Sequence, residues 1–132
     1  MKKISKKKTI TEIARKYSLS LLVLFGSRAT GKALPSSDID IAFQSKKTLS
    51  LAQETALAYD LSLFFANDAI DIVNLKKTSP LLLYAIFKDG KVLYEAQKFI
   101  FAHMRGYAFK QFVEAAPLYR DQHLRLTKKY GV

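Results

Sequence analysis

The segment 38–43, with the sequence DIDIAF, constrains the fold of this chain more than any other segment. Large apolar side chains occupy every second position, and two aspartates and an alanine occupy the positions between them. A period of two is typical of a β-strand that packs one face against a core. Asp38 and Asp40 therefore project from the same face of a strand, with Cα atoms about 7 Å apart.

The rest of the chain shows apolar patterns that predict helices alternating with strands. Thr9 or Thr11 can cap a first helix, a short helix or turn is expected at 27–33, and a loop is expected at 34–37. Further strands are predicted at 19–25, 69–75 and 91–94, and further helices at 50–65, at 80–88 and from about 97 onward. Pro117 is expected to divide the terminal helical region or to kink it. This order predicts a small α/β (α+β) domain with one mixed sheet flanked by helices.

Length and charge describe one basic domain. The chain has 132 residues, and 22 Lys and Arg against 11 Asp and Glu give a formal net charge of +11. We expect a basic tail at 1–8 and a single domain at 9–132. The tail is interpreted as a solvated terminus, with a contact to nucleic acid or to an acidic partner as the alternative.

Composition excludes several classes of site. The chain has no cysteine, which excludes a disulfide scaffold, a cysteine zinc site and a cysteine nucleophile. No apolar run approaches the roughly 18 residues that span a bilayer, so we expect a cytoplasmic protein without a membrane segment. His103 and His123 lack the spacing of a metal site and are interpreted as ordinary helix residues.

Three carboxylates are placed where they could bind a metal ion. Asp71 lies in another alternating apolar run, so it joins Asp38 and Asp40 if the two strands are neighbours. Adjacent carboxylates repel one another, and a divalent cation between them removes that conflict. Hard oxygen ligands suit Mg²⁺, and one or two such ions could assist the in-line displacement of a phosphoryl group. Asp71 is the candidate proton acceptor for an attacking hydroxyl. Taken alone, an Asp-x-Asp pair is more often a solvated strand edge than a metal site, and an aspartate such as Asp71 is more often a surface residue than a catalyst.

A second candidate feature is the turn Gly26-Ser27, at the end of a predicted strand. Glycine allows backbone N–H groups to approach a phosphate, and the Ser27 hydroxyl adds a donor. Arg28 and Lys32 are near enough in sequence to add positive charge. The spacing from Gly26 to Gly31 and Lys32 also fits a P-loop, but Ala33 stands where a P-loop carries Ser or Thr.

Together these residues resemble the minimal nucleotidyltransferases of the DNA polymerase β superfamily. The resemblance is carried by GSRATGKALPSSDIDIAF at 26–43 and AIDIVNL at 69–75, and extends to the helix and short strand of 80–95. It implies the polymerase β-like fold and transfer of a nucleoside monophosphate from an NTP to a hydroxyl. It also implies Asp38, Asp40 and Asp71 as catalytic metal ligands, and Gly26, Ser27 and Arg28 as nucleotide-binding residues.

The length of the chain resembles that of the MNT antitoxins, which pair with HEPN ribonuclease toxins. That resemblance implies transfer of AMP from ATP to a tyrosine of the toxin, with Mg²⁺ as cofactor, in a hetero-oligomer with the HEPN-type protein. Two alternatives remain open: an antitoxin that acts by binding alone, and nucleotidyl transfer to a small molecule or RNA. Nucleic-acid binding is compatible with the basic charge but is not required.

Overall fold

The computed structural model describes residues 8–32 and 38–130, so most of the expected basic tail and all of the expected 34–37 loop lie outside the described residues. One four-stranded sheet has the order β3-β2-β1-β4, with β1 antiparallel to β2 and β4, and β2 parallel to β3. The strands are β1 (Leu19–Phe25), β2 (Ile39–Ser45), β3 (Ile70–Asn74) and β4 (Lys91–Glu95). The helices are α1 (Ile10–Lys16), α2 (Ser27–Thr30), α3 (Leu51–Phe65), the 3₁₀ turn η1 (Leu75–Lys77), α4 (Pro80–Asp89) and α5 (Ile100–Tyr130).

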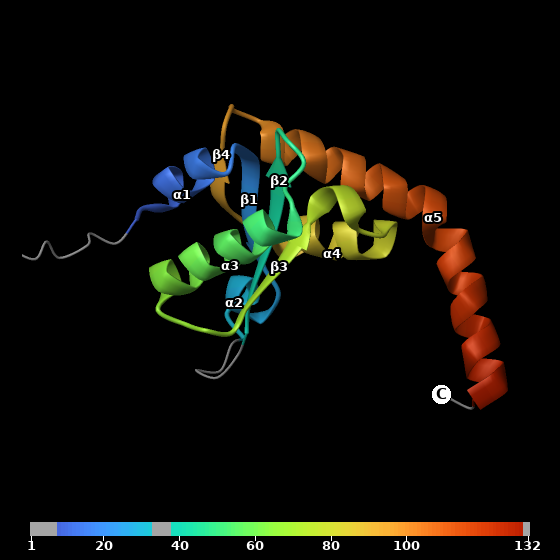
Figure 1. Ribbon diagram of the computed structural model, residues 1–132. Coiled ribbons are helices and arrows are strands. Elements are labelled where there is room, and N and C mark those ends of the chain that lie inside the picture. The colour runs from blue at the N-terminus through green and yellow to red at the C-terminus, as the bar shows by residue number, and fades with distance from the viewer. Residues whose placement is uncertain (1–7, 33–37, 131–132) are drawn as a thin grey trace, which may run out of the picture.

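Helices cover both faces of the sheet. Figure 1 shows α1 and α3 on one side, α4 and α5 on the other, and α2 at the end of the strands. The predicted mixed sheet flanked by helices is therefore confirmed. None of the helices in the described part of the chain is long and apolar enough to cross a membrane.

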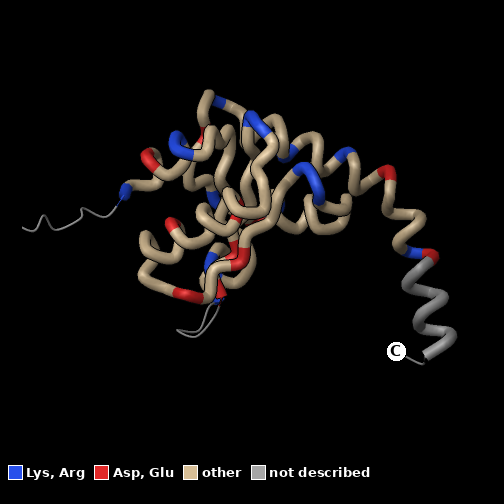
Figure 2. The backbone as a smooth tube through the Cα atoms, in the orientation of Figure 1, with Lys and Arg blue, Asp and Glu red and all other residues tan. Residues whose placement is uncertain are grey.

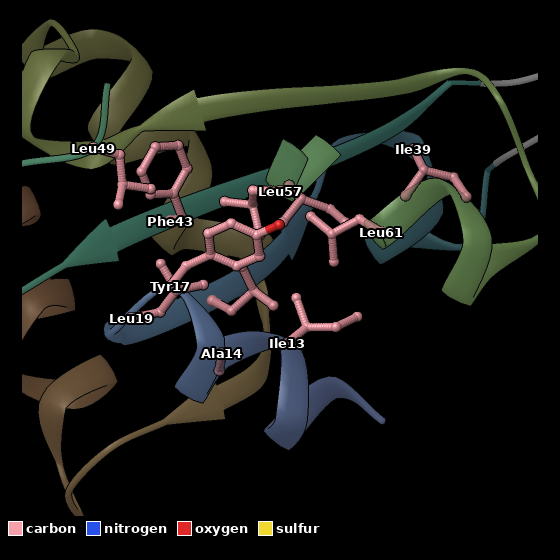
Figure 3. Close-up of a cluster of buried hydrophobic side chains, with 11 residues drawn as sticks. Ile13, Ala14, Tyr17, Leu19, Ile39, Phe43, Leu49, Leu57 and Leu61 are labelled. Atoms are coloured by element: carbon pink, nitrogen blue, oxygen red, sulfur yellow. The ribbon is translucent and has the colours of Figure 1, made fainter. Parts of the chain in front are cut away.

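The face under α1 and α3 holds the larger apolar cluster. Figure 3 shows side chains of α1, β1, β2 and α3 meeting there, with Phe43 and Leu57 among the fully buried ones. The apolar positions of the DIDIAF segment all join this cluster, as their period predicts. Complete burial of a Leu or Phe side chain contributes about 1.5–3 kcal/mol each.

A buried polar contact joins α1 to α3 at the edge of this cluster. The Asp60 carboxylate accepts hydrogen bonds from the Tyr17 hydroxyl at 2.7 Å and from Lys16 Nζ at 2.9 Å. Burial alone would raise the pKa of Asp60, but these two hydrogen bonds and the charges of Lys16 and Lys8 outweigh it and hold that pKa below its usual value. This contact could not be predicted from local sequence patterns, because Tyr17 and Asp60 lie far apart in the chain.

The opposite face packs against α4 and α5. Its buried members include Val23 of β1, Ala42 of β2 and Phe87 of α4. A bulge in β1 between Leu19 and Leu21 shifts the alternation, because two consecutive positions of β1 face one of β2 there. For that reason Leu19 and Leu22 belong to the first cluster, whereas Leu21 and Val23 belong to the second.

Side-chain caps define where the helices begin. Thr9, not Thr11, caps α1 in a capping box with Glu12, and Ser50 caps α3 in a capping box with Gln53. Pro80 occupies the first turn of α4, where its missing N–H costs no hydrogen bond. These three starts agree with the sequence prediction.

The terminal helix differs from its prediction. It begins at Ile100 rather than at 97, because Phe99 adopts a positive φ of 72° that interrupts helical backbone. It is one helix that contains Pro117, and Figure 1 shows it bent along its length. The alternative of two separate helices is therefore wrong, and the bend in this single helix agrees with the predicted kink.

Candidate active site

Asp40 and Asp71 are direct neighbours across two parallel strands. In the register of β2 and β3, Asp40 is paired with Asp71 and Ala42 with Val73. Side chains at paired positions project from the same face of a sheet. Asp38 precedes Asp40 by two positions and is exposed, so the three carboxylates lie at one end of the sheet.

This end of the sheet is not covered by α4 and α5. Ala42 and Val73 contact the second apolar cluster, whereas Asp40 is half-buried and Asp71 is exposed. Figure 2 shows acidic positions gathered beside α2 at this end of the strands. The carboxylates are therefore positioned by a rigid sheet and remain accessible to a ligand.

The three carboxylates influence one another electrostatically. Burial, followed by the negative charges of Asp71 and Asp38, raises the pKa of Asp40 above its usual value. Both effects disfavour the ionised form of Asp40. A cation at this position would reverse the balance and favour three ionised carboxylates.

Gly26 lies against the Asp40 side chain. Its φ of 73° and ψ of −155° form a conformation that residues with a Cβ rarely adopt. A Cβ at this position would collide with Oδ2 of Asp40 and would lie 3.2 Å from its Cγ. Glycine at position 26 thus permits both the turn after β1 and the placement of Asp40.

The turn leads into the one-turn helix α2. Phe25 pairs with Asp40 in the register of β1 and β2. Ser27 is two residues after Phe25, so the chain enters α2 next to the acidic end of the sheet. Arg28 is half-buried in α2, and Lys32 is exposed just after it. Gly31, at a φ of 76°, ends α2 after Thr30, so the long helix that a P-loop would open does not follow Gly26.

The donor set fits a hard divalent cation. Among the described residues, no three His, Asp or Glu side chains lie close enough together to hold a metal ion in the conformation shown. Burial and the charges of Asp71 and Asp38 raise the pKa of Asp40, so a bound cation would favour the ionised carboxylates that a metal site needs. Carboxylate oxygens are the ligands that Mg²⁺ prefers, and they leave positions open for water and phosphate.

A family model supports the same part of the chain. Residues 8–99 match the model described as "Polymerase beta, Nucleotidyltransferase". The chain belongs to this family. The matched region contains the whole sheet, the Gly26 turn and the three aspartates.

Two curated relatives carry the name "Protein adenylyltransferase MntA". The relative from Aphanizomenon flos-aquae is 41% identical, and the match covers 58% of this chain and 57% of the relative. The relative from Shewanella oneidensis is 35% identical, and the match covers 61% of this chain and 57% of the relative. The chain thus matches little more than half the length of each relative.

Solved structures of similar fold extend the comparison beyond the family model. A structure described as a toxin-antitoxin with AMP-PNP aligns with a TM-score of 0.70 at 26% identity, covering 86% of this chain and 95% of its own. A second contains a tri-AMPylated Shewanella oneidensis HEPN toxin in complex with an MNT antitoxin. It aligns with a TM-score of 0.60 at 27% identity, covering 86% of this chain and 92% of its own. The polymerase β-like fold expected from the sequence is confirmed.

Proposed function

We propose that this chain is a Mg²⁺-dependent nucleotidyltransferase that transfers AMP from ATP to a tyrosine hydroxyl of a HEPN-type ribonuclease toxin, and so acts as its antitoxin. The observation that carries the proposal is the group of Asp38, Asp40 and Asp71 at the open end of the sheet, beside the Gly26 turn. This group combines ligands for a divalent cation with backbone suited to phosphate.

The residues at this end take separate roles in the proposed reaction. The backbone of Gly26 and Ser27 would hold the triphosphate, with Arg28 contributing positive charge beside it. The acceptor hydroxyl would attack the α-phosphorus from the side opposite to pyrophosphate. A bond forms between the acceptor oxygen and phosphorus, the bond from phosphorus to pyrophosphate breaks, and Asp71 accepts the hydroxyl proton. Asp71 suits this role because it is exposed and therefore accessible to the acceptor.

Asp38, Asp40 and Asp71 would hold one or two Mg²⁺ ions. When bound there, Mg²⁺ supplies electrostatic stabilisation of the phosphate oxygens of the nucleotide. The pKa of Asp40, raised in the protein by burial and by its two neighbours, makes this site one that gains from a cation.

The similar proteins support ATP as the donor of AMP and a HEPN-type toxin as its acceptor. AMP-PNP, an analogue of ATP, is named with one similar structure, and an AMPylated HEPN toxin is named with another. Two relatives bear the name protein adenylyltransferase. The proposed partner is accordingly a HEPN-type protein, bound in a hetero-oligomer.

Label transfer tests the proposal directly. The purified protein is incubated with Mg²⁺ and α-labelled ATP, CTP, GTP or UTP in a lysate of its own host that contains the HEPN-type protein. We expect label from ATP in one protein band. The variant with Asp38→Asn and Asp40→Asn should give none, whereas Asp68→Asn removes an exposed carboxylate outside the three and should retain transfer.

The other functions predict different results. Label in RNA or in a small molecule would keep the reaction type and contradict the protein acceptor. If the double variant still neutralised the toxin in cells, the chain would act by binding alone. The proposal requires that label transfer and neutralisation are lost together.

A further inference from the structure

Two adjoining clefts run along the first half of α5, on the face of the sheet that α4 and α5 cover. One has a volume of about 400 Å³ and the other about 420 Å³. Gln44, His103 and Met104 line both clefts, so they form one continuous groove, here called the α5 groove. Tyr107 lines it farther along the helix, and its side chain is half exposed.

The α5 groove lies at the end of the sheet opposite the carboxylates. Gln44 is four positions after Asp40 on β2, which places it about 13 Å farther along the strand. A molecule in the groove would therefore not occupy the nucleotide site. It would lie near enough for a protein to contact both places at once.

The charged side chains that line the groove are basic. They are Lys76 and Lys98, accompanied by His103, and no carboxylate among the described residues lines either cleft. Exposed Lys46 and Lys77 stand on the adjoining turns. Figure 2 shows basic positions where α5 begins, whereas acidic positions stand beside the basic positions of α2 at the other end of the strands. A groove lined by positive charge attracts a negatively charged ligand.

Apolar side chains decide which kind of anionic ligand fits best. Leu75, Leu83 and Ile100 contribute to the walls, and Phe99 at one end is 74% exposed. Aliphatic walls with a polar rim are typical of a groove that receives the side chains of a protein segment. Single-stranded nucleic acid instead relies on successive aromatic rings along a basic track. The two aromatic side chains of the groove, Tyr107 and Phe99, line different clefts and form no such series.

We propose that the α5 groove docks an acidic segment of the acceptor protein and holds it while its hydroxyl reaches the carboxylate end. This inference rests on the proposed function. Charge argues against two other occupants of the groove, the segment 1–8 of this chain and a second copy of the chain. The segment 1–8 contains five lysines, and a second copy carries the same net charge of +11.

The test separates docking from chemistry. Lys98→Glu combined with His103→Glu reverses the charge of the groove without altering any residue of the proposed active site. Lys110→Glu is the matched control, because Lys110 is exposed on α5 and lines neither cleft. With the purified HEPN-type protein as acceptor, we expect the KM for acceptor to rise about 10-fold in the double variant, because like charges now oppose one another. The kcat and the KM for ATP should stay within about twofold of their original values, as should every constant of the control.

A second measurement does not depend on catalysis. Binding of the HEPN-type protein is measured without ATP by sedimentation, for the original protein and for both variants, after thermal unfolding has shown that each variant folds. A photo-crosslinking residue at position 107 should link to a segment of the partner that is rich in Asp and Glu. Fluorescent oligouridine serves as the nucleic-acid probe.

Each result decides the inference. Unchanged KM and unchanged binding in the double variant would overturn it, and so would a failure of the original protein to bind the HEPN-type protein. Loss of oligouridine binding alone, with the acceptor constants unchanged, would identify an RNA surface instead. If the original protein binds without transferring AMP, and the double variant binds more weakly than the control, docking stands while the proposed reaction fails.

Discussion

The Oδ2 oxygen of Asp40 occupies the space in which a side chain at position 26 would begin. Gly26 and Asp40 come from the end of β1 and the start of β2, and the antiparallel pairing of these strands brings them together. The turn proposed to hold phosphate and the carboxylate proposed to hold the metal ion are thus one packed unit. A change in either one should disturb the other.

Gly26→Ala should abolish AMP transfer, because the added Cβ displaces the Asp40 carboxylate. Gly31→Ala is the matched control, since Gly31 has nearly the same φ but no atom within 4 Å of an added Cβ. Gly31→Ala should lower the free energy of unfolding by about 1–2 kcal/mol, because position 31 is left-handed. Gly26→Ala should lower it further, because its ψ of −155° lies in a region almost restricted to glycine. Denaturant unfolding and label transfer measure the two effects. Equal activity of the two variants would show that contact with Asp40 does not matter.

Asp40→Asn should change how stability depends on pH. Because the pKa of Asp40 is raised in the folded protein, the folded state retains a proton that the unfolded chain has already released. The original protein therefore loses stability as pH rises through the raised pKa, and the asparagine variant does not. Denaturant unfolding at about pH 3 and about pH 7 measures the free energy of unfolding of both proteins. Relative to the original protein, the variant should be more stable at about pH 7 than at about pH 3. A difference that stays constant with pH would contradict this account.

Mg²⁺ should stabilise the protein through the same carboxylates. A cation that binds only the folded state raises the melting temperature in proportion to the logarithm of its concentration. We expect this rise for the original protein and none for the variant with Asp38→Asn and Asp40→Asn. KCl at matched ionic strength controls for screening of charge. An equal rise in both proteins would place the ion elsewhere.

Asp60→Ala should destabilise the fold without impairing catalysis. It leaves the buried Tyr17 hydroxyl without the acceptor it contacts at 2.7 Å and removes the partner of Lys16. We expect a loss of about 2 kcal/mol in the free energy of unfolding, against about 1 kcal/mol for Tyr17→Phe, which removes only one hydrogen bond. Label transfer measured well below the melting temperature should be unchanged in both variants.

The same carboxyl gives a distinct response to acid. The pKa of Asp60 is lowered overall in the folded protein, so its contribution is present at neutral pH and disappears as pH falls through the lowered pKa. Asp60→Asn should therefore be less stable than the original protein at neutral pH, and the gap should narrow in acid. Chemical unfolding across this pH range measures the gap, and one that widened on acidification would refute the assignment.

The local features of the fold were determined by the sequence alone. Period-two alternation defined β2 and β3, and Ser50 and Pro80 marked the starts of α3 and α4. These features depend on neighbours within a few positions along the chain, where side-chain period and capping chemistry act. The candidate carboxylates could be chosen for the same reason, since Asp38 and Asp40 share a strand face.

Contacts between distant segments were decided only by the tertiary structure. Pairing of Asp40 with Asp71, the approach of Gly26 to Asp40 and the Tyr17–Asp60 hydrogen bond each join segments whose distance is set by strand order and helix packing. The bulge in β1 has the same origin, because it shifts the alternation of the strand so that Leu19 and Leu21 reach different clusters. Local chemistry in the sequence proposed the reactive groups, and packing of the whole chain determined which of them meet.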